Sequence, residues 1–441
     1  MKRIIIVKMK KVIIAVSFLF GFSLVGKTQE YTLTLEKAIE LGLQNHQQLK
    51  ISEAKTDVSK QQLKVAKNQM LPSVEISANA FYLGDVMLLN TDWSKLQTID
   101  MPNFGNTFGV QASQLLYKGG VIRESIKIAK LQIQLAELDR VSNEQEIKFL
   151  IISNYLDIQK LINQIHVLEA NKILAEQILD NITKLYEQEM VTRNELIRSE
   201  LQIKNLEQTI LSMKHGHAIL SNQLSYALGL PNDVLLIPEE NKPLGVVLQP
   251  QNYYMNVAYQ QHSALQMVAK NVEIAEKNVD IQKTNWFPVL SAFGGYNMQR
   301  PLTSSMPPMD LYNNSWQVGL NLTFHLDDLY KNKQHVDVSK SEARVAQESA
   351  LLVRQNIEIN VNAAFLKCQE AEQQTILMYE TKNLANENYE IVQAKYLNQL
   401  AIMAEMTDAS NAKLNAELQF VNAIINAQFQ YYSLLKSTGT L

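Results

Sequence analysis

The chain has 441 residues, of which 41 are basic and 44 acidic, so its formal net charge is −3. This near balance predicts no nucleic-acid partner, because such partners select basic surfaces. The single cysteine, Cys368, excludes an internal disulfide framework and a cysteine-rich metal site. We expect Cys368 to act as a small apolar residue on a helix.

The N-terminus has the pattern of a secretory signal peptide. A lysine-rich start is followed by an apolar run over residues 12–25 and by small residues just before a cleavage point. We therefore expect residues 1–28 to be a signal peptide, whether translation begins at Met1 or at Met9. The alternative is an uncleaved membrane anchor, but the run is shorter than the roughly 20 apolar residues that a spanning helix needs.

The first half of the chain begins with one predicted helix and two predicted strands. Apolar residues at helical spacing cover residues 34–70, and Pro72 ends the helix. Apolar and polar residues then alternate over residues 74–82, as in a strand with one apolar face. A polar loop over residues 84–106 leads to a second strand of the same kind over residues 107–118.

Two long helices follow. No proline interrupts residues 103–230, so a helix of unusual length is allowed there. We predict one over residues 121–186, which would span roughly 100 Å at 1.5 Å per residue. A short break over residues 187–194 precedes a return helix to Leu228. A glycine and a proline then stop that helix in the usual order.

The second half of the chain repeats this order. We predict a helix over residues 253–286 and two strands over residues 288–299 and 314–326. A long helix over residues 331–396 and a return helix over residues 404–435 follow. Pro72 and Pro288 lie 216 residues apart, and Gly229 and Gly439 lie 210 apart. The repetition predicts a first structural repeat, a linker and a second repeat over residues 29–230, 231–252 and 253–441.

The predicted strands carry the alternation of a membrane-spanning barrel. Trp316, Val318 and Leu320 alternate with polar or small residues, as in barrel strands of about ten residues. Four strands are too few to close a pore, and an open sheet edge cannot exist in lipid. Several chains must therefore pool their strands, and three chains would contribute twelve. The long helices fit an ordinary coiled coil and a water-filled helical tube equally well.

Motifs for catalysis, nucleotide binding or metal binding are missing from the sequence. It contains no G-x-x-x-x-G-K-[ST], H-E-x-x-H or G-x-S-x-G motif. His215 and His217 come nearest to a metal pair, but residues two apart on a helix point to different faces. We expect both histidines to be solvated, and we predict no enzyme, no cofactor and no metal site.

These features resemble the TolC family of outer-membrane efflux proteins over nearly the whole chain. The resemblance rests on the order, spacing and duplication of short motifs: Leu71-Pro72, residues 114–120, tyrosine-led turns after each long helix, residues 227–230, Phe287-Pro288 and residues 437–441. It implies a mainly α fold with a small β part. Long antiparallel coiled-coil helices would form a trimeric α-barrel, and the four strands would join a twelve-stranded transmembrane β-barrel.

The resemblance implies a passive exit duct in the outer membrane, with a periplasmic helical extension. The duct would serve a tripartite efflux or type I secretion system. Its partners would be two further copies of the chain, outer-membrane lipid, a periplasmic adaptor (membrane fusion) protein and, indirectly, an inner-membrane pump. The alternative function is a non-conducting coiled-coil structural protein of the envelope. Such a scaffold has no need of strands with one apolar and one polar face.

The resemblance also implies residues for a gate at the periplasmic tip. The paired acidic positions of the family fall on Glu405 and Asp408, and a helix-latching acid falls on Glu195. Ala401 replaces the arginine with which that acid usually pairs, so the usual salt bridge cannot form. The tip turns of the family fall on Tyr186, Glu189, Tyr396 and Gln399.

Overall fold

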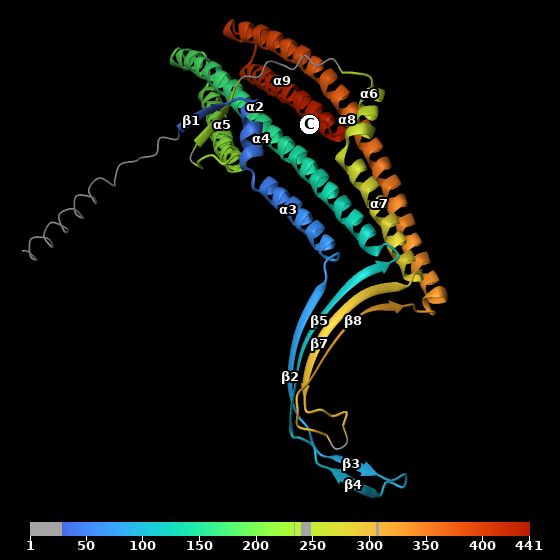
Figure 1. The fold of residues 1–441 in the computed structure, drawn as a ribbon. Coiled ribbons are helices and arrows are strands. Elements are labelled where there is room, and N and C mark those ends of the chain that lie inside the picture. Colours follow the sequence, from blue (N-terminus) through green and yellow to red (C-terminus); the bar gives the residue numbers. More distant parts are fainter. Residues whose placement is uncertain (1–28, 233, 240–247, 306–307) are drawn as a thin grey trace, which may run out of the picture. The chain divides into compact units, whose positions relative to one another are not determined.

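The computed structural model describes residues 29–232, 234–239, 248–305 and 308–441 (Figure 1). The predicted signal peptide, and with it the choice between Met1 and Met9, lies outside the described residues. None of the helices in the described part is both long and apolar enough to cross a membrane.

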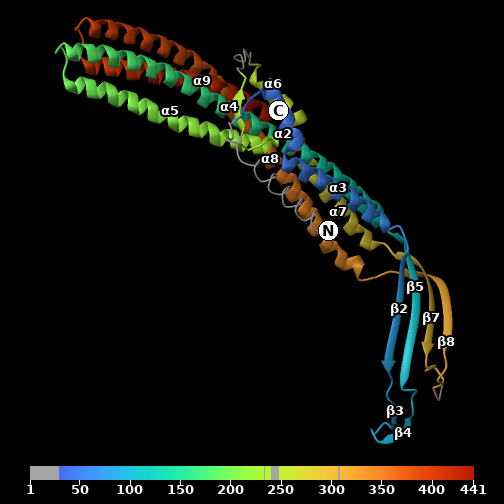
Figure 2. The same cartoon turned by 90° about the vertical axis from the view of Figure 1, so that its left-hand side faces the viewer.

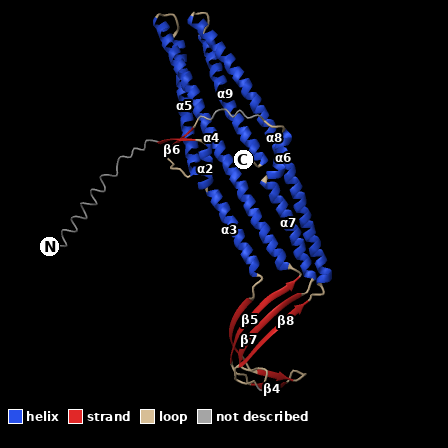
Figure 3. Ribbon diagram, turned by 45° about the horizontal axis from the view of Figure 1, so that its top comes forward, coloured by secondary structure: helices blue, strands red, loops and turns tan. Residues whose placement is uncertain are grey.

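Helices make up most of the described chain (Figure 3). They are α2 (Leu35–Asn45), α3 (Gln47–Asn68), α4 (Val121–Glu187), α5 (Arg193–Leu228), α6 (Gln251–Gln261), α7 (Ser263–Lys283), the short 3-10 helix η1 (Thr284–Trp286), α8 (Asp328–Leu397) and α9 (Met403–Thr438). The strands are β1 (Gln29–Leu33), β2 (Ser73–Tyr82), β3 (Val86–Leu89), β4 (Lys95–Ile99), β5 (Phe104–Lys118), β6 (Val234–Pro238), β7 (Val289–Arg300) and β8 (Asn313–Thr323).

The chain folds into two compact units, and each unit contains segments from both halves of the sequence. The first comprises the residues up to Lys50 together with Ser142–His262 and Ile357–Leu441; the second comprises Ile51–Val141 and Ser263–Asn356. Helices α4 and α8, of 67 and 70 residues, run through both units without interruption, as predicted. The division of the chain into two repeats and a linker follows the sequence order and remains a prediction.

The predicted helices over residues 34–70 and 253–286 are each interrupted by a histidine. His46 separates α2 from α3, and His262 separates α6 from α7. Both histidines have extended backbone torsions, with ψ of 126° and 116°, so the helical hydrogen-bond ladder stops there. Neither break contains the proline or glycine that would reveal it in the sequence.

The ends of the return helices lie close to these breaks. Gly229 ends α5 in the left-handed conformation, and a Cβ atom on it would lie 2.8 Å from Asn45. Gly439 ends α9 in the same way, and a Cβ atom there would lie 2.8 Å from the Cα atom of His262. The side chain of Asn45 also donates a hydrogen bond to the carbonyl of Leu228, at 2.9 Å. Each kinked helix therefore makes room for a helix end from far along the chain.

The predicted linker over residues 231–252 contains a strand. β6 pairs in parallel with β1, from Gln29 opposite Val234 to Leu33 opposite Pro238. The carbonyl oxygen of Leu236 lies 2.7 Å from Nε2 of His217, which is buried. The expectation that both histidines are solvated is therefore wrong for His217, because β6 covers this part of α5.

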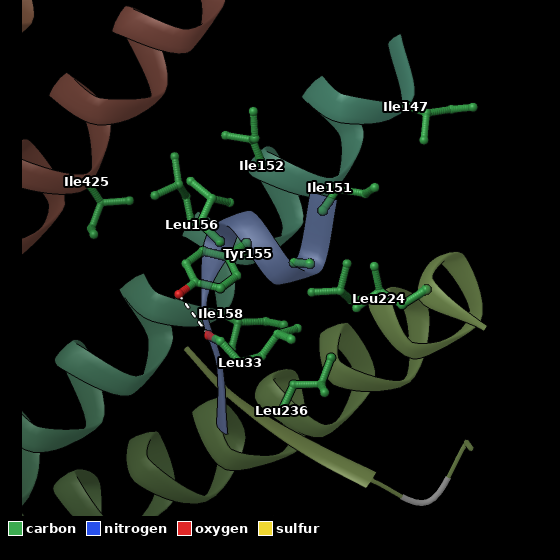
Figure 4. Close-up of a cluster of buried hydrophobic side chains, with 13 residues drawn as sticks. Leu33, Ile147, Ile151, Ile152, Tyr155, Leu156, Ile158, Leu224, Leu236 and Ile425 are labelled. Atoms are coloured by element: carbon green, nitrogen blue, oxygen red, sulfur yellow. Dashed lines mark hydrogen bonds between the residues drawn. The ribbon is translucent and has the colours of Figure 1, made fainter. Parts of the chain in front are cut away.

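One apolar cluster in the first unit packs β1 and β6 against the surrounding helices (Figure 4). It joins side chains from β1, α2, α4, α5, β6 and α9. Tyr155 of α4 is fully buried, and its hydroxyl donates a hydrogen bond to the carbonyl of Leu33, at 3.0 Å. Cys368 is also buried on α8, which confirms its predicted role as a small apolar residue.

Candidate functional site: a two-faced sheet and two helix tips

Strands β2, β5, β7 and β8 form one antiparallel sheet in that order (Figure 2). Because residues paired across an antiparallel sheet point to the same side, the register assigns each side chain to a face. One face is apolar. Two of its neighbouring rows consist of Ile76, Val110, Tyr296 and Trp316, and of Val74, Ala112, Gly294 and Val318.

The opposite face of the sheet is polar. Its corresponding rows consist of Glu75, Gln111, Gly295 and Gln317, and of Ser77, Gly109, Asn297 and Ser315. These residues line a hollow of about 440 Å³, so the polar side is the concave one. The alternation predicted from the sequence thus extends across all four strands as one two-faced surface.

The apolar face is exposed within the single chain. Ile76 is 79% exposed, Trp316 76% and Val318 78%. Removing one large apolar side chain from water is worth roughly 1.5–3 kcal/mol, so several in a row strongly favour an apolar surrounding. The face therefore fits contact with lipid, while the polar face fits contact with water.

Within the part of the chain that the structure describes, neither edge of this sheet has a further strand partner. β2 pairs with β5 alone, and β8 pairs with β7 alone. Each edge presents backbone N–H and C=O groups without strand partners, which carries a large cost in a hydrocarbon environment. A sheet that contacts lipid therefore needs further strands at both edges.

The two helix tips share one turn geometry. Glu189, between α4 and α5, and Gln399, between α8 and α9, have φ of 59° and 61°. The N–H of Glu189 donates to the carbonyl of Tyr186 at 2.9 Å, and the N–H of Gln399 donates to that of Tyr396 at 2.9 Å. Glycine is the usual residue in this left-handed position. Both tips therefore hold a strained backbone with a polar side chain.

An apolar cluster joins the four helices near the tips. Its buried members are Ile178, Ile182, Tyr389, Tyr396, Met403 and Met406. Ala401 packs against the cluster, at the position where the resemblance expects an arginine. The hydroxyl of Tyr396 donates to Oε2 of Glu195 at 3.4 Å, so the predicted latch acid pairs with a tyrosine of its own chain. Burial raises the pKa of the Tyr396 phenol to about 12, and the nearby Glu195 adds to the shift.

The two predicted gate acids lie on one exposed face of α9. Glu405 and Asp408 are exposed, whereas Met403, Met406 and Ala409 point into the protein. Oε2 of Glu405 accepts the N–H of Ile402 at 3.2 Å, which satisfies one free donor at the start of the helix. Glu405 thus has a capping role that the sequence analysis did not identify. Among the described residues, no cluster of three or more potential metal ligands occurs.

A two-faced, membrane-type sheet carried on long paired helices is the architecture of a membrane channel protein. The sequence pattern of the family "Outer membrane efflux protein" matches residues 38–230 and 255–440. These two segments cover most of the chain, which therefore belongs to the outer membrane efflux protein family. No curated protein matches the chain significantly.

Solved structures of outer-membrane channels share the fold. The channel CusC is 15% identical with a TM-score of 0.77, and the match covers 95% of both chains. The channel OprN is 13% identical with a TM-score of 0.76, covering 92% of this chain and 90% of OprN. CmeC from Campylobacter jejuni is 16% identical with a TM-score of 0.73, covering 95% of this chain and 91% of CmeC.

Several predictions from the sequence are confirmed by the family and the fold. The protein is an outer-membrane efflux channel of the TolC type, mainly helical with one four-stranded antiparallel sheet. Membership of a transport family also confirms that it is not an enzyme. Two features escaped the sequence analysis, although both leave a trace in it. They are the hairpin of β3 and β4, and the exposed apolar residues that recur every seven positions on α3 and α8. The latter are Ile51, Val58 and Val65 on α3, and Val338, Val345, Leu352, Ile359 and Leu366 on α8.

Proposed function

We propose that the protein assembles as a homotrimer and conducts solutes passively across the outer membrane. The observation that carries this proposal is the two-faced sheet with two unpaired edges. If β2 of one copy pairs with β8 of the next, three copies close a twelve-stranded barrel. The apolar face then contacts lipid and the polar face lines a water-filled channel.

The helices offer a second set of contacts between copies. Exposed apolar residues follow one another at intervals of seven along α8: Val338, Val345, Leu352, Ile359 and Leu366. On α3, exposed apolar residues have the same spacing: Ile51, Val58 and Val65. An interval of seven is the period of a coiled-coil seam. These seams support helix pairing between neighbouring copies, which would extend the channel as an α-barrel.

The partners of the channel follow from its place in the outer membrane. A passive duct needs a source of energy elsewhere, so we infer an inner-membrane pump and a periplasmic adaptor that connects the two. The tips carrying Glu189 and Gln399 are the surface for the adaptor. The system is either a tripartite efflux pump or a type I secretion system. The cargo is set by the pump.

We also propose that the tips form the gate. Glu405 and Asp408 would give six carboxylates around the axis of a trimer, a ring that favours cations. Glu195, Tyr186 and Tyr396 would hold the helix ends in the closed arrangement.

The order of elements from α2 to α5 recurs from α6 to α9, which supports the two proposed repeats over residues 29–230 and 253–441.

The proposal is tested by mass and conductance. The purified protein in mild detergent should have three times the mass of one chain, and it should conduct ions in a planar bilayer. A monomer that keeps its full β-structure would exclude the pooled barrel. A stable trimer without conductance would favour the coiled-coil scaffold instead.

A further inference from the structure

The connection between β2 and β5 is an ordered hairpin with exposed apolar side chains. β3 and β4 pair from Val86 opposite Ile99 to Leu89 opposite Lys95. Met87, Leu89 and Leu96 are exposed, and Trp93 at the turn is 82% exposed. A two-stranded hairpin is at best marginally stable alone in water, so an apolar one needs cover.

The turn of this hairpin is tightly fixed. Ser94 donates to Oδ1 of Asp92 through its backbone N–H at 2.9 Å and through its hydroxyl at 2.6 Å. The N–H of Asn90 donates to the carbonyl of Ser94 at 2.8 Å, which closes the turn. Trp93 is held between them with φ of 67°, a conformation that is a genuine outlier for a bulky residue. A large apolar side chain is thus presented at the tip on a strained backbone.

The hairpin lies at the end of the sheet opposite the helices, because α3 leads into β2 and α4 follows β5. Figures 1 and 3 show it turned to the side toward which the sheet bends. The concave side of the sheet carries Glu75, Ser77 and the other polar residues around the hollow. The apolar hairpin therefore extends over the polar face of the sheet and away from its apolar face.

We propose that the β3/β4 hairpins of three copies contact one another across the outer mouth of the channel. This inference rests on the proposed trimer. Three-fold symmetry would bring the three hairpins around one axis, where Met87, Leu89, Trp93 and Leu96 of each copy find apolar partners in the next. The contact forms an apolar constriction at the outer end, separate from the acidic gate at the periplasmic tips.

Disulfide cross-linking tests this contact in the full-length channel. In a Cys368→Ala background, Trp93→Cys and Leu96→Cys are introduced one at a time. The control is Tyr82→Cys, which is exposed at the same end of the sheet but lies on the apolar, lipid-facing side. The mass of each variant in detergent is measured first, so that assembly and hairpin contact are judged separately.

The proposal expects trimers in which mild oxidation links Trp93→Cys chains into dimers, while Tyr82→Cys chains stay unlinked. Dimers rather than trimers are expected because one disulfide joins two of the three chains. Trimers in which neither hairpin variant is linked would overturn the contact. Loss of the trimer itself would reject the proposed assembly, and the hairpin contact with it.

A second measurement separates contact between hairpins from insertion into lipid. Trp286→Phe and Trp316→Phe leave Trp93 as the single tryptophan. Brominated lipid should leave its emission unchanged, whereas it should quench a protein that keeps Trp316 alone. Strong quenching of Trp93 would place the hairpin in the membrane and overturn the proposal.

Discussion

The hydroxyl of Tyr396, at the end of α8, donates a hydrogen bond to the carboxylate of Glu195, in the first turn of α5, at 3.4 Å. This bond connects the two helical hairpins at their tips. Glu195 is the acid that the family resemblance assigns to a latch between neighbouring helices. In this chain Ala401 stands in place of the usual arginine partner, and Tyr396 bonds to the acid instead. The acid proposed for the latch is therefore hydrogen-bonded to a tyrosine of its own chain.

Replacing this tyrosine should destabilise the tip slightly. Tyr396→Phe removes one hydrogen bond and should lower the free energy of unfolding by about 1 kcal/mol. Tyr389→Phe is the matched control, since the Tyr389 hydroxyl is buried in the same cluster without a hydrogen-bond partner. That variant should be neutral or stabilised. Denaturant unfolding followed by helical circular dichroism distinguishes them, and equal losses would contradict this account.

The same tyrosine should make stability fall at high pH. A raised pKa means that the folded state favours the neutral phenol, so the stabilisation is complete below pH 10, the ordinary value for tyrosine. It is lost as the pH rises from 10 to about 12. Tyr396→Phe should therefore flatten the stability profile in this range. A profile that stays parallel to that of the unmodified protein would show that Tyr396 does not titrate as described.

Glycine at the tip turns should stabilise the protein. A left-handed backbone costs a non-glycine residue roughly 1–2 kcal/mol, while glycine loses roughly 0.5–1 kcal/mol more entropy on folding. Glu189→Gly and Gln399→Gly should thus each gain about 0.5–1 kcal/mol. Lys184→Gly, in the last turn of α4, is the control and should lose about 1 kcal/mol. Thermal unfolding midpoints give the comparison, and a loss at both turns would show that their side chains make stabilising contacts.

The two kink histidines should make the first unit sensitive to acid. Burial lowers the pKa of His46 and of His262 from 6.5, so the folded state favours their neutral forms. Their contribution to stability is present above pH 6.5 and is lost as the pH falls below it. His46→Asn with His262→Asn should reduce this loss, whereas His215→Asn, on an exposed face of α5, should not. Unfolding midpoints between pH 5 and 8 provide the test.

Neutralising the two acids proposed for the gate should weaken block by multivalent cations. Glu405→Gln keeps an oxygen for the N–H of Ile402, so it removes the charge while preserving the helix cap. Combined with Asp408→Asn it should reduce block of single-channel current in a planar bilayer. Glu380→Gln, an exposed acid on α8 away from the tip, should leave the block unchanged. Equal block in both variants would remove Glu405 and Asp408 from the gate.

The elements that the sequence predicted are those whose signals are local. Proline and glycine frame the long helices, so the predicted helix over residues 121–186 differs by one residue from α4. The breaks at His46 and His262 lie against Gly229 and Gly439, which are 183 and 177 residues further along the chain, so no local pattern reveals them. The sequence predicts a linker where β6 lies, because its strand partner β1 is also far away along the chain. The burial of His217 follows from that missed strand.

In the candidate site, too, the features with a local sequence signal are the ones that the sequence predicts. The alternation in β8 identified the membrane face, because a strand assigns its faces by its own sequence. The prediction of Glu405 and Asp408 as site residues rests on the family resemblance. The capping role of Glu405 can be recognised only once the structure shows that α9 begins at Met403. The hairpin around Trp93 lies within residues 84–106, for which the sequence predicts a polar loop. Its apolar residues are not in strict alternation, since the pairing shifts register between Leu88 and Leu89.

The central claim is that β2 of one copy pairs with β8 of the next, and inter-chain disulfides test it most directly. In a Cys368→Ala background, Ser77→Cys is combined in turn with Asn313→Cys, Ser315→Cys, Gln317→Cys and Gly319→Cys, all on the polar face. β2 and β8 are opposite edges of the sheet within one chain, so a link between them must join two chains. The account predicts that one register yields covalent dimers and trimers under mild oxidation. Assembled protein that forms no such link at any register would contradict a barrel closed by these edges.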